Sequence, residues 1–307
     1  MRARIDRIEA AIHRDVGRGV APLFAASTGG LWGAVSALTA SPPRAVGLLT
    51  GFFVPGGTPP AAETDGPAGA ALLAAAFAKA GVPCRVLTDD SCRSACVAAL
   101  RGAGVPAVPV DSVAPDADPD AAIATWRCHG IDWAIAIERC GPSADGIARN
   151  MRGEDVGRFT ARLDRVFSAG PWRTIAIGDG GNEVGMGSLP PGLIARTVAF
   201  GAAIACVTPA DYLITAGVSH WGAYALIAAM GWPECLDPAI DRRILETLVR
   251  DGPAVDGVTL GRTLTIDGID LATHAVRMAA LRRLAPGPPP RASQRQSPRA
   301  LQPRDRP

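Results

Sequence analysis

Residues 174–187 combine the residue types of a catalytic loop. An apolar strand at 174–177 runs into five glycines within ten residues, and Asp179, Asn182 and Glu183 lie among those glycines. A strand followed by a glycine-rich turn exposes backbone N–H groups at the carboxyl end of the strand. Because unpaired charges are costly to bury, two carboxylates at this place have no packing role. We therefore expect acid–base chemistry at this loop.

The known glycine-rich loops fit this segment poorly. The dinucleotide-binding fingerprint needs a third glycine where Glu183 stands, and the chain has no Gly-Lys-Ser/Thr for a phosphate loop. Two carboxylates would also repel a phosphate unless a metal lay between them. Taken alone, the segment also fits a tight connection without function.

Two other predicted strands end in loops with carboxylates. The strand at 45–52 leads into a Pro/Gly loop that ends in Glu63 and Asp65, and the strand at 133–137 delivers Glu138, Arg139 and then Asp145. Open α/β sheets bind ligands at the carboxyl ends of their strands. We therefore expect these loops to form one shared site. The alternative for Glu138 and Arg139 is a structural ion pair at a strand end.

These segments together resemble the D-glutamate cyclase family. The resemblance extends in order to about residue 284 and implies a lyase that interconverts D-glutamate with 5-oxo-D-proline and water. The chain departs from the family pattern at Cys140 and Pro142, at the non-aromatic residues 147–149, and at His220, where asparagine is common. The segments that carry the resemblance are 50–52, 63–67, 138–139, 145–146, 150–153, 178–183 and 216–226.

Closing glutamate into a lactam requires two opposite proton transfers. The ammonium must lose a proton before nitrogen can attack, and the γ-carboxyl group must be protonated or polarised. Two carboxylates about 4 Å apart repel by roughly 4 kcal/mol at an effective dielectric of about 20, which keeps one of them protonated. The acid and base candidates are Asp179 and Glu183 first, then Glu63, Asp65 and Asp145.

Several side chains are predicted to bind the substrate. We expect Arg139 and Arg152 to hold its carboxylates in bidentate fashion, and the N–H groups of Gly180 and Gly181 to form an oxyanion site. The predicted substrate-binding set is Glu138, Arg139, Asn150, Arg152, Gly180, Gly181, Asn182, Ser219 and His220.

A bound divalent cation is the other way to offset the repulsion between neighbouring carboxylates. Mg²⁺ or Mn²⁺ prefers oxygen ligands, and Asp179 with Glu183 is the candidate pair, although no spacing rule identifies it. A metal-dependent hydrolase of a small phosphate ester or amide is therefore the alternative function, and an amino-acid-binding module is a third. Lys79 is the single lysine, which disfavours Schiff-base chemistry with pyridoxal phosphate.

The composition of the chain limits the remaining possibilities for compartment and binding partners. The 307-residue chain is 48% apolar with a net charge of +2, and residues 285–307 contribute five arginines and one aspartate, so residues 1–284 carry about −2. The Pro/Arg-rich segment 285–307 predicts a disordered tail. Seven cysteines without a Cys-x-x-Cys pair indicate a reducing cytoplasm. We expect a small-molecule amino-acid substrate and neither nucleic acid nor membrane as partner, and leave a homo-oligomer open.

Strand and helix patterns alternate along the chain, which predicts a largely parallel sheet flanked by helices in a Rossmann-like α/β domain over residues 1–284. No apolar run reaches the roughly 18 residues of a membrane span, and 1–20 reads as a surface helix. Asp256 and Asp267 precede glycines and are interpreted as turn residues. Strands are expected at 45–52, 82–88, 105–110, 131–138, 173–178 and 211–216, and helices at 66–80, 91–102, 119–129, 219–230, 238–250 and 270–283.

Overall fold

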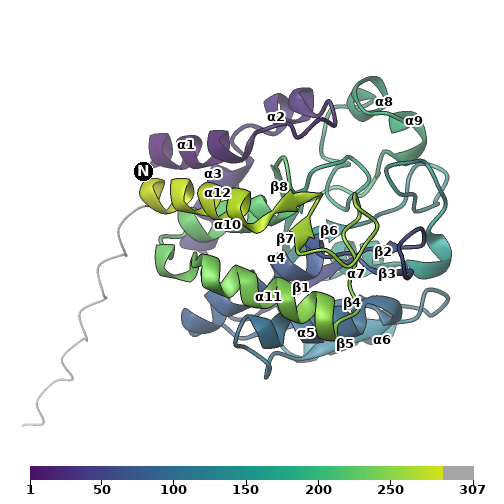
Figure 1. The fold of residues 1–307 in the computed structure, drawn as a ribbon, viewed down its shortest axis with the longest axis horizontal. Coiled ribbons are helices and arrows are strands. Elements are labelled where there is room, and N and C mark those ends of the chain that lie inside the picture. The colour runs from purple at the N-terminus through teal and green to yellow at the C-terminus, as the bar shows by residue number, and fades with distance from the viewer. Residues whose placement is uncertain (286–307) are drawn as a thin grey trace, which may run out of the picture.

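A six-stranded parallel sheet forms the centre of the molecule (Figure 1). The computed structural model describes residues 1–285, so the tail predicted at 285–307 lies outside the described residues except for Ala285. The strand order is β5-β4-β1-β6-β7-β8, which is the order of a doubly wound fold and confirms the predicted fold class. The strands are β1 Val46–Gly51, β4 Cys84–Asp89, β5 Val110–Val113, β6 Trp133–Arg139, β7 Arg173–Gly178 and β8 Tyr212–Thr215.

Both faces of the sheet are buried, as a parallel sheet requires. Along β6, Ile135 and Ile137 point into the larger core, whereas Ala134 and Ala136 point into the smaller core on the opposite face. The larger core is covered by α1 Arg2–Ile12, α3 Gly30–Ala40, α4 Asp65–Lys79, α5 Arg93–Gly102, α10 Ser219–Ala229, α11 Pro238–Asp251 and α12 Leu271–Leu284. The smaller core is covered by α2 Ala21–Ser27, α6 Asp120–Cys128 and α7 Leu163–Ala169.

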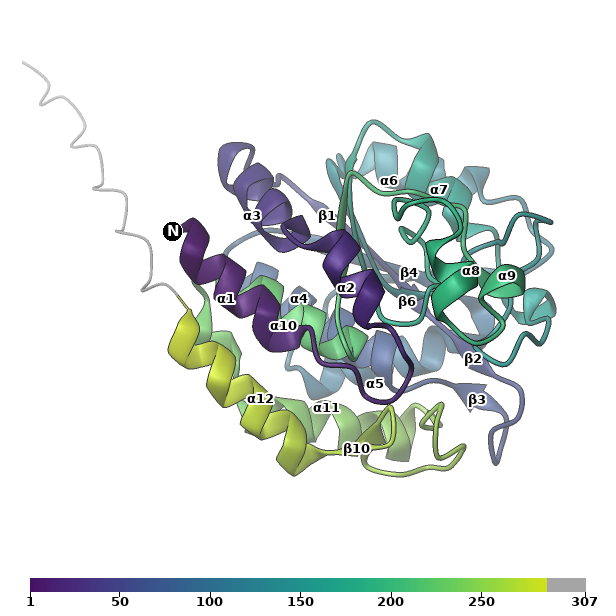
Figure 2. The ribbon, with the colours of Figure 1, turned by 90° about the horizontal axis from the view of Figure 1, so that it is seen from above.

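The first and last helices, α1 and α12, lie side by side (Figure 2). The Arg277 guanidinium of α12 donates to the Ala11 carbonyl of α1 at 2.6 Å. Ile5, Ile8 and Ile12 are buried, so the surface helix predicted at 1–20 has a core face. It also ends earlier than predicted, and residues 13–20 form a loop.

Two features of the sequence interpretation need correction. The strand predicted at 105–110 begins only at Val110, because Pro106 and Pro109 have no N–H to donate to a neighbouring strand. Helices α2 and α3 were not predicted. The remaining short elements are β2 Phe53–Val54, β3 Ala61–Ala62, α8 Leu193–Thr197, α9 Gly201–Ile204, β9 Thr265–Ile266 and β10 Ile269–Asp270.

One helical stretch, Ala21–Ala40, is long and apolar enough by composition to cross a membrane, contrary to the expectation from the sequence. The stretch is divided into α2 and α3 at Thr28 and Gly29, and Leu31, Val35 and Leu38 pack into the larger core. A core helix passes the same test of length and composition, so this stretch is weak evidence for a span.

The carboxyl edge of the sheet contains the switch point of a doubly wound fold. Strands β1 and β6 are neighbours although they are far apart in the sequence, and the next connections run in opposite directions from them. Ligands bind in the crevice outside such a pair of strands. The chain carries Glu138 at the end of β6, Asp179 just after β7 and Ser219 just after β8.

Candidate active site

Five parts of the chain that are distant in sequence meet in a pocket of about 170 Å³ at this edge. The buried acidic side chains of its lining are those of Glu63, Glu138, Asp179 and Asp267, and Arg18 enters from the loop after α1. All these carboxylates are at least nine-tenths buried. The remainder of the lining is Phe52, Val54, Pro55, Gly56, Asn150, Met151, Arg152, Glu154, Asn182, Gly257 and Val258.

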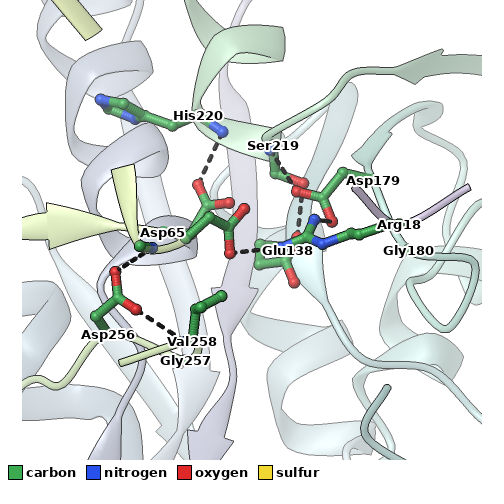
Figure 3. A network of polar contacts seen from close by, with 12 residues as sticks. Arg18, Asp65, Glu138, Asp179, Gly180, Ser219, His220, Asp256, Gly257 and Val258 are labelled. Carbon is green, nitrogen blue, oxygen red and sulfur yellow. Dashed lines mark hydrogen bonds and ion pairs between the residues drawn. The ribbon is translucent and has the colours of Figure 1, made fainter. Parts of the chain in front are cut away.

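Asp179 is held from two sides (Figure 3). Its Oδ1 lies 2.5 Å from Nη1 of Arg18, and its Oδ2 accepts a hydrogen bond of 2.8 Å from the backbone N–H of Ser219. Ser219 is the first residue of α10, so the positive end of that helix dipole also faces the carboxylate. Each oxygen of Asp179 therefore meets a positive group.

Glu138 adopts a strained backbone conformation, with φ at 44°. A left-handed conformation costs a residue with a side chain about 1–2 kcal/mol and is typical of functional sites. Its Oε2 accepts a hydrogen bond of 2.6 Å from the Ser219 hydroxyl. Burial, followed by the charges of Asp179 and Glu183, raises the pKa of Glu138 well above its usual range.

Glu63 is the pocket carboxylate without a hydrogen-bond donor among residues 1–285. It packs so closely on the backbone of Gly257 that a Cβ atom there would lie 1.8 Å from its Oε1. Burial raises the pKa of Glu63 well above its usual range, and the charges of Asp267 and Asp179 raise it further. Burial therefore favours the protonated form of Glu63, whose side chain lines the pocket.

Asp65 lies behind the pocket at the start of α4. Its Oδ1 accepts a hydrogen bond of 2.8 Å from the backbone N–H of His220 (Figure 3), while Oδ2 is buried without a partner among the described residues. Burial and the neighbouring charges of Asp267 and Asp179 raise the pKa of Asp65 well above its usual range. Burial likewise favours the protonated form of Asp65, which does not line the pocket.

Asp267 occupies the turn between β9 and β10 with φ at 55°. Its Oδ1 pairs with Nη2 of Arg18 at 2.7 Å. Burial raises the pKa of Asp267 to about 7 although Arg18 acts in the opposite direction. The prediction of a turn residue is confirmed, but the turn also aims this carboxylate into the pocket. Asp256 is a turn residue whose carboxylate accepts the N–H groups of Val258 and Thr259.

Glu183 shapes the glycine-rich loop from within. Its carboxylate accepts the backbone N–H groups of Asp179, Gly180 and Gly181 at 2.7, 2.6 and 2.6 Å. Glu183 as acid or base, and Gly180 and Gly181 as oxyanion donors, stay predictions; in this arrangement these groups bind one another and do not line the pocket. Glu183 positions Asp179.

Sequence comparison identifies the family. The profile described as D-glutamate cyclase-like, C-terminal, matches residues 8–282. That span contains every pocket residue named above. The chain belongs to this family. Human mitochondrial D-glutamate cyclase is 30% identical over 209 residues, which are 64% of this chain and 34% of that enzyme. The chain therefore matches about a third of the length of its human relative.

Two residues that support the resemblance to the D-glutamate cyclase-like family lie outside the pocket. Arg139 is fully buried and pairs with Asp89 outside the pocket lining, which favours the alternative of a structural ion pair, with a different partner; its contact with substrate stays a prediction. Asp145 is half-exposed and pairs with Arg149 at 2.7 Å. The hydrogen bond from Arg149 lowers the pKa of Asp145, and the role of Asp145 as an acid or base of the cluster stays a prediction.

His220 contributes its backbone rather than its ring. The imidazole is buried, and its Nε2 lies 2.7 Å from Oδ1 of Asp241. Asp241 also accepts the hydroxyl of Tyr224. The His220 side chain does not line the pocket, because α10 turns it into the core while the first N–H groups of α10 point toward Asp65 and Asp179. Its contact with substrate stays a prediction.

The remaining predicted residues do lie at the pocket. Asn182 donates to the Arg149 carbonyl at 2.8 Å, and Asn150 accepts the backbone N–H of Arg152 at 2.9 Å, so both amides order the pocket loops. Arg152 is exposed at the rim. Sequence reasoning missed Arg18, whose only local signal is its place between Gly17 and Gly19 in a loop.

The predicted metal ligands fit a divalent cation poorly. In each of two clusters of three acidic residues, the possible ligand atoms lie within 4.8 Å of one another. The clusters are Asp65–Asp179–Asp267 and Glu138–Asp179–Glu183. Glu183 already uses three of its roughly four acceptor positions on backbone N–H groups. In the other group, the Arg18 guanidinium already bridges Asp179 and Asp267. A cation would have to displace these donors.

Proposed function

We propose that this chain is a lyase that interconverts D-glutamate with 5-oxo-D-proline and water. Its family and its human relative support an enzyme of the cyclase or lyase type. The observation that carries the proposal is the meeting of Glu63 and Asp179 in one small pocket. Burial favours the uncharged form of the first, and the second is an ion-paired carboxylate. Lactam formation needs one group of each kind.

The proposed reaction balances as follows. Asp179 takes a proton from the substrate ammonium, and the freed amine attacks the γ-carbon, so that a C–N bond forms. Glu63 donates a proton to the departing γ-oxygen, and the C–O bond breaks. In total, two protons leave the nitrogen and two arrive on that oxygen, which departs as water. General acid–base transfers of this kind each contribute about 10²–10⁴-fold in rate.

The acidic lining also favours the ammonium of an amino acid over an uncharged substrate. Arg152 at the rim supplies a bidentate site for the α-carboxylate. The hydroxyl of Ser219 links Glu138 to the first turn of α10, so Glu138 is held where it can exchange a proton with Asp179.

Turnover tests the proposal. The pure protein is incubated with D-glutamate or with 5-oxo-D-proline, with and without Mn²⁺, and the other compound is followed by chiral chromatography. We expect conversion in both directions and its loss in Asp179→Asn. Absence of conversion with either enantiomer under all these conditions contradicts the proposal.

The same samples discriminate the alternatives predicted from the sequence. A metal-dependent hydrolase would release phosphate from a small ester only after metal is added. An amino-acid-binding module would be stabilised thermally by D-glutamate in wild type and Asp179→Asn alike, without turnover.

A further inference from the structure

The loop after α1 is built to deliver Arg18 to the pocket. Gly17 and Gly19 flank it with φ at 102° and 74°, conformations that favour glycine. Oδ1 of Asp15 accepts the backbone N–H groups of Gly17 at 2.9 Å and of Arg18 at 2.8 Å, which fixes the turn. The geometry of this short loop therefore determines where the guanidinium points.

The same loop is anchored beside the carboxyl end of β8. The backbone N–H of Gly217 donates to the Ile12 carbonyl at 2.9 Å. Gly217 also lies so close to the chain that a Cβ atom there would be 1.8 Å from the Arg14 carbonyl oxygen. This contact places the loop next to α10, whose first residue also binds Asp179.

The guanidinium of Arg18 has more N–H donors than its ion pairs use. It carries five N–H groups, and its two ion pairs use one each on Nη1 and Nη2. Nη1 is buried and its approach to Asp179 lacks good hydrogen-bond geometry. Burial disfavours the charge, but the charges of Asp179, Asp267 and Glu138 outweigh this effect and raise the pKa of Arg18. Arg18 is therefore a fixed cation that lines the pocket and remains 20% exposed.

The proposed reaction needs a hydrogen-bond donor that faces the oxyanion in the pocket. Attack on the γ-carboxyl group creates an oxyanion, and the backbone N–H groups of Gly180 and Gly181 are already bound to Glu183. Arg139 is withdrawn into its pair with Asp89. Among the described residues that line the pocket, the basic side chains are Arg18 and Arg152, and Arg18 is the one in contact with Asp179.

Building on the proposed lyase function, we propose that Arg18 is a catalytic residue that binds the reacting γ-carboxyl group and stabilises its tetrahedral oxyanion. Nitrogen donates its electron pair to the γ-carbon next to Asp179, and the carbonyl electrons move onto an oxygen that faces the guanidinium. When the pair returns, the protonated oxygen departs as water. Arg152 binds the α-carboxylate and takes no part in the charge that develops.

Matched arginine variants separate the two roles. Arg18→Gln should lower kcat by about 10²–10³-fold, the usual cost of one oxyanion donor, whereas Arg152→Gln should chiefly raise KM. Arg18→Lys keeps the charge beside Asp179 and Asp267 and therefore the fold, but it loses the fork and should also lose kcat. In Arg18→Ala, added guanidinium at millimolar concentration should restore part of the rate, which a structural role of Arg18 would not allow.

Binding of glutarate, measured by titration calorimetry, tests the inference without turnover. Glutarate has both carboxylates but no amine, and its affinity should fall by about tenfold or more in Arg18→Gln, the effect of losing a charge-assisted hydrogen bond. Unchanged kcat or unchanged glutarate affinity in a folded Arg18→Gln overturns the inference. If wild type binds glutarate through Arg18 but converts neither D-glutamate nor 5-oxo-D-proline, the lyase proposal and the oxyanion role of Arg18 fail together. The conclusion that then stands is that Arg18 binds a carboxylate in this pocket.

Discussion

At the scale of single residues, the pocket separates its carboxylates by their partners. Asp179 and Asp267 share the Arg18 guanidinium, whereas the carboxylate of Glu63 has no donor among the described residues. Burial favours the protonated form of a carboxyl group, and a neighbouring cation opposes this effect. The proposed function therefore gives two chemically similar side chains opposite roles in one pocket, as acid–base catalysis at neutral pH requires.

The role of Glu63 as proton donor predicts the behaviour of Glu63→Gln. The amide fits the same volume but has no acidic proton, so kcat should fall by about 10²-fold or more. The melting temperature should not fall, because the amide has nearly the shape of the carboxyl group and the described residues donate no hydrogen bond to the Glu63 side chain. Steady-state kinetics and thermal denaturation check both results.

Asp145→Asn is the matched control, because it makes the same chemical change at the half-exposed pair with Arg149 outside the pocket. It should keep nearly full activity. Equal activity of wild type and Glu63→Gln would show that another group donates the proton.

The raised pKa of Asp267 predicts a loss of stability as pH rises. Its folded-state pKa is about 7 and its ordinary value is 3.8, so between these values the folded state retains a proton that the unfolded state has lost. Stability therefore falls as pH increases through this window, and the whole penalty is present above it. At about 1.4 kcal/mol for each pKa unit, the penalty is a few kcal/mol.

Asp267→Asn isolates this effect. Burial lowers the pKa of His274 to about 4, which acts with the opposite sign in both proteins and cancels in their difference. Relative to wild type, the variant should therefore gain melting temperature from pH 5 to pH 8. A constant difference across this range would mean that Asp267 does not titrate there.

The sequence could not reveal Arg18 or the second role of Asp267. Both lie far from the segments that resemble the D-glutamate cyclase family, and an arginine between two glycines is an ordinary loop pattern. Conversely, Glu183 and Arg139 lie inside those segments but act within the protein, because a motif does not show which way a side chain points. The acids Glu63 and Asp179 could be predicted, since each follows a strand at the carboxyl edge.

At the scale of elements, catalytic positions depend on short loops held by backbone contacts. The Gly17–Gly19 turn carries Arg18, the β9–β10 turn carries Asp267, and the loop after β7 carries Asp179. Most strands and helices could be predicted because their apolar patterns are regular. Helices α2 and α3 could not, since serine, threonine and glycine residues at 27–30, 33, 36 and 39 interrupt their apolar pattern.

Gly17→Ala tests the dependence on the turn. Its φ is 102° and no atom lies within 4 Å of the added Cβ, so the change acts through backbone strain of about 1 kcal/mol. Gly81→Ala is the matched control, with φ at 78° and equally open space after α4. Both should lose similar melting temperature, but only Gly17→Ala should lower kcat.

If both glycine variants keep full activity despite the same destabilisation, the conformation of the Arg18 loop does not matter for the reaction. Thermal denaturation and steady-state kinetics on the two proteins provide the comparison.

At the scale of the whole molecule, the doubly wound sheet gathers residues from both ends of the chain. The strand order β5-β4-β1-β6-β7-β8 places its switch point at the pocket. Helices α1 and α12 pack together (Figure 2), and this brings Arg18 against Asp267 although about 250 residues separate them in the chain. The pocket is therefore formed by segments from much of the α/β fold.

Oxygen-isotope transfer tests the central claim most directly. The protein is incubated with 5-oxo-D-proline in ¹⁸O-water, and the D-glutamate formed is analysed by mass spectrometry. At early times we expect one ¹⁸O atom in the γ-carboxyl group of D-glutamate in wild type and none above background in Asp179→Asn. If no ¹⁸O enters D-glutamate after prolonged incubation of 5-oxo-D-proline with the wild type, a lyase that adds water at the γ-carbon is contradicted. If Asp179→Asn incorporates as much ¹⁸O as the wild type, the role of Asp179 in that step is contradicted.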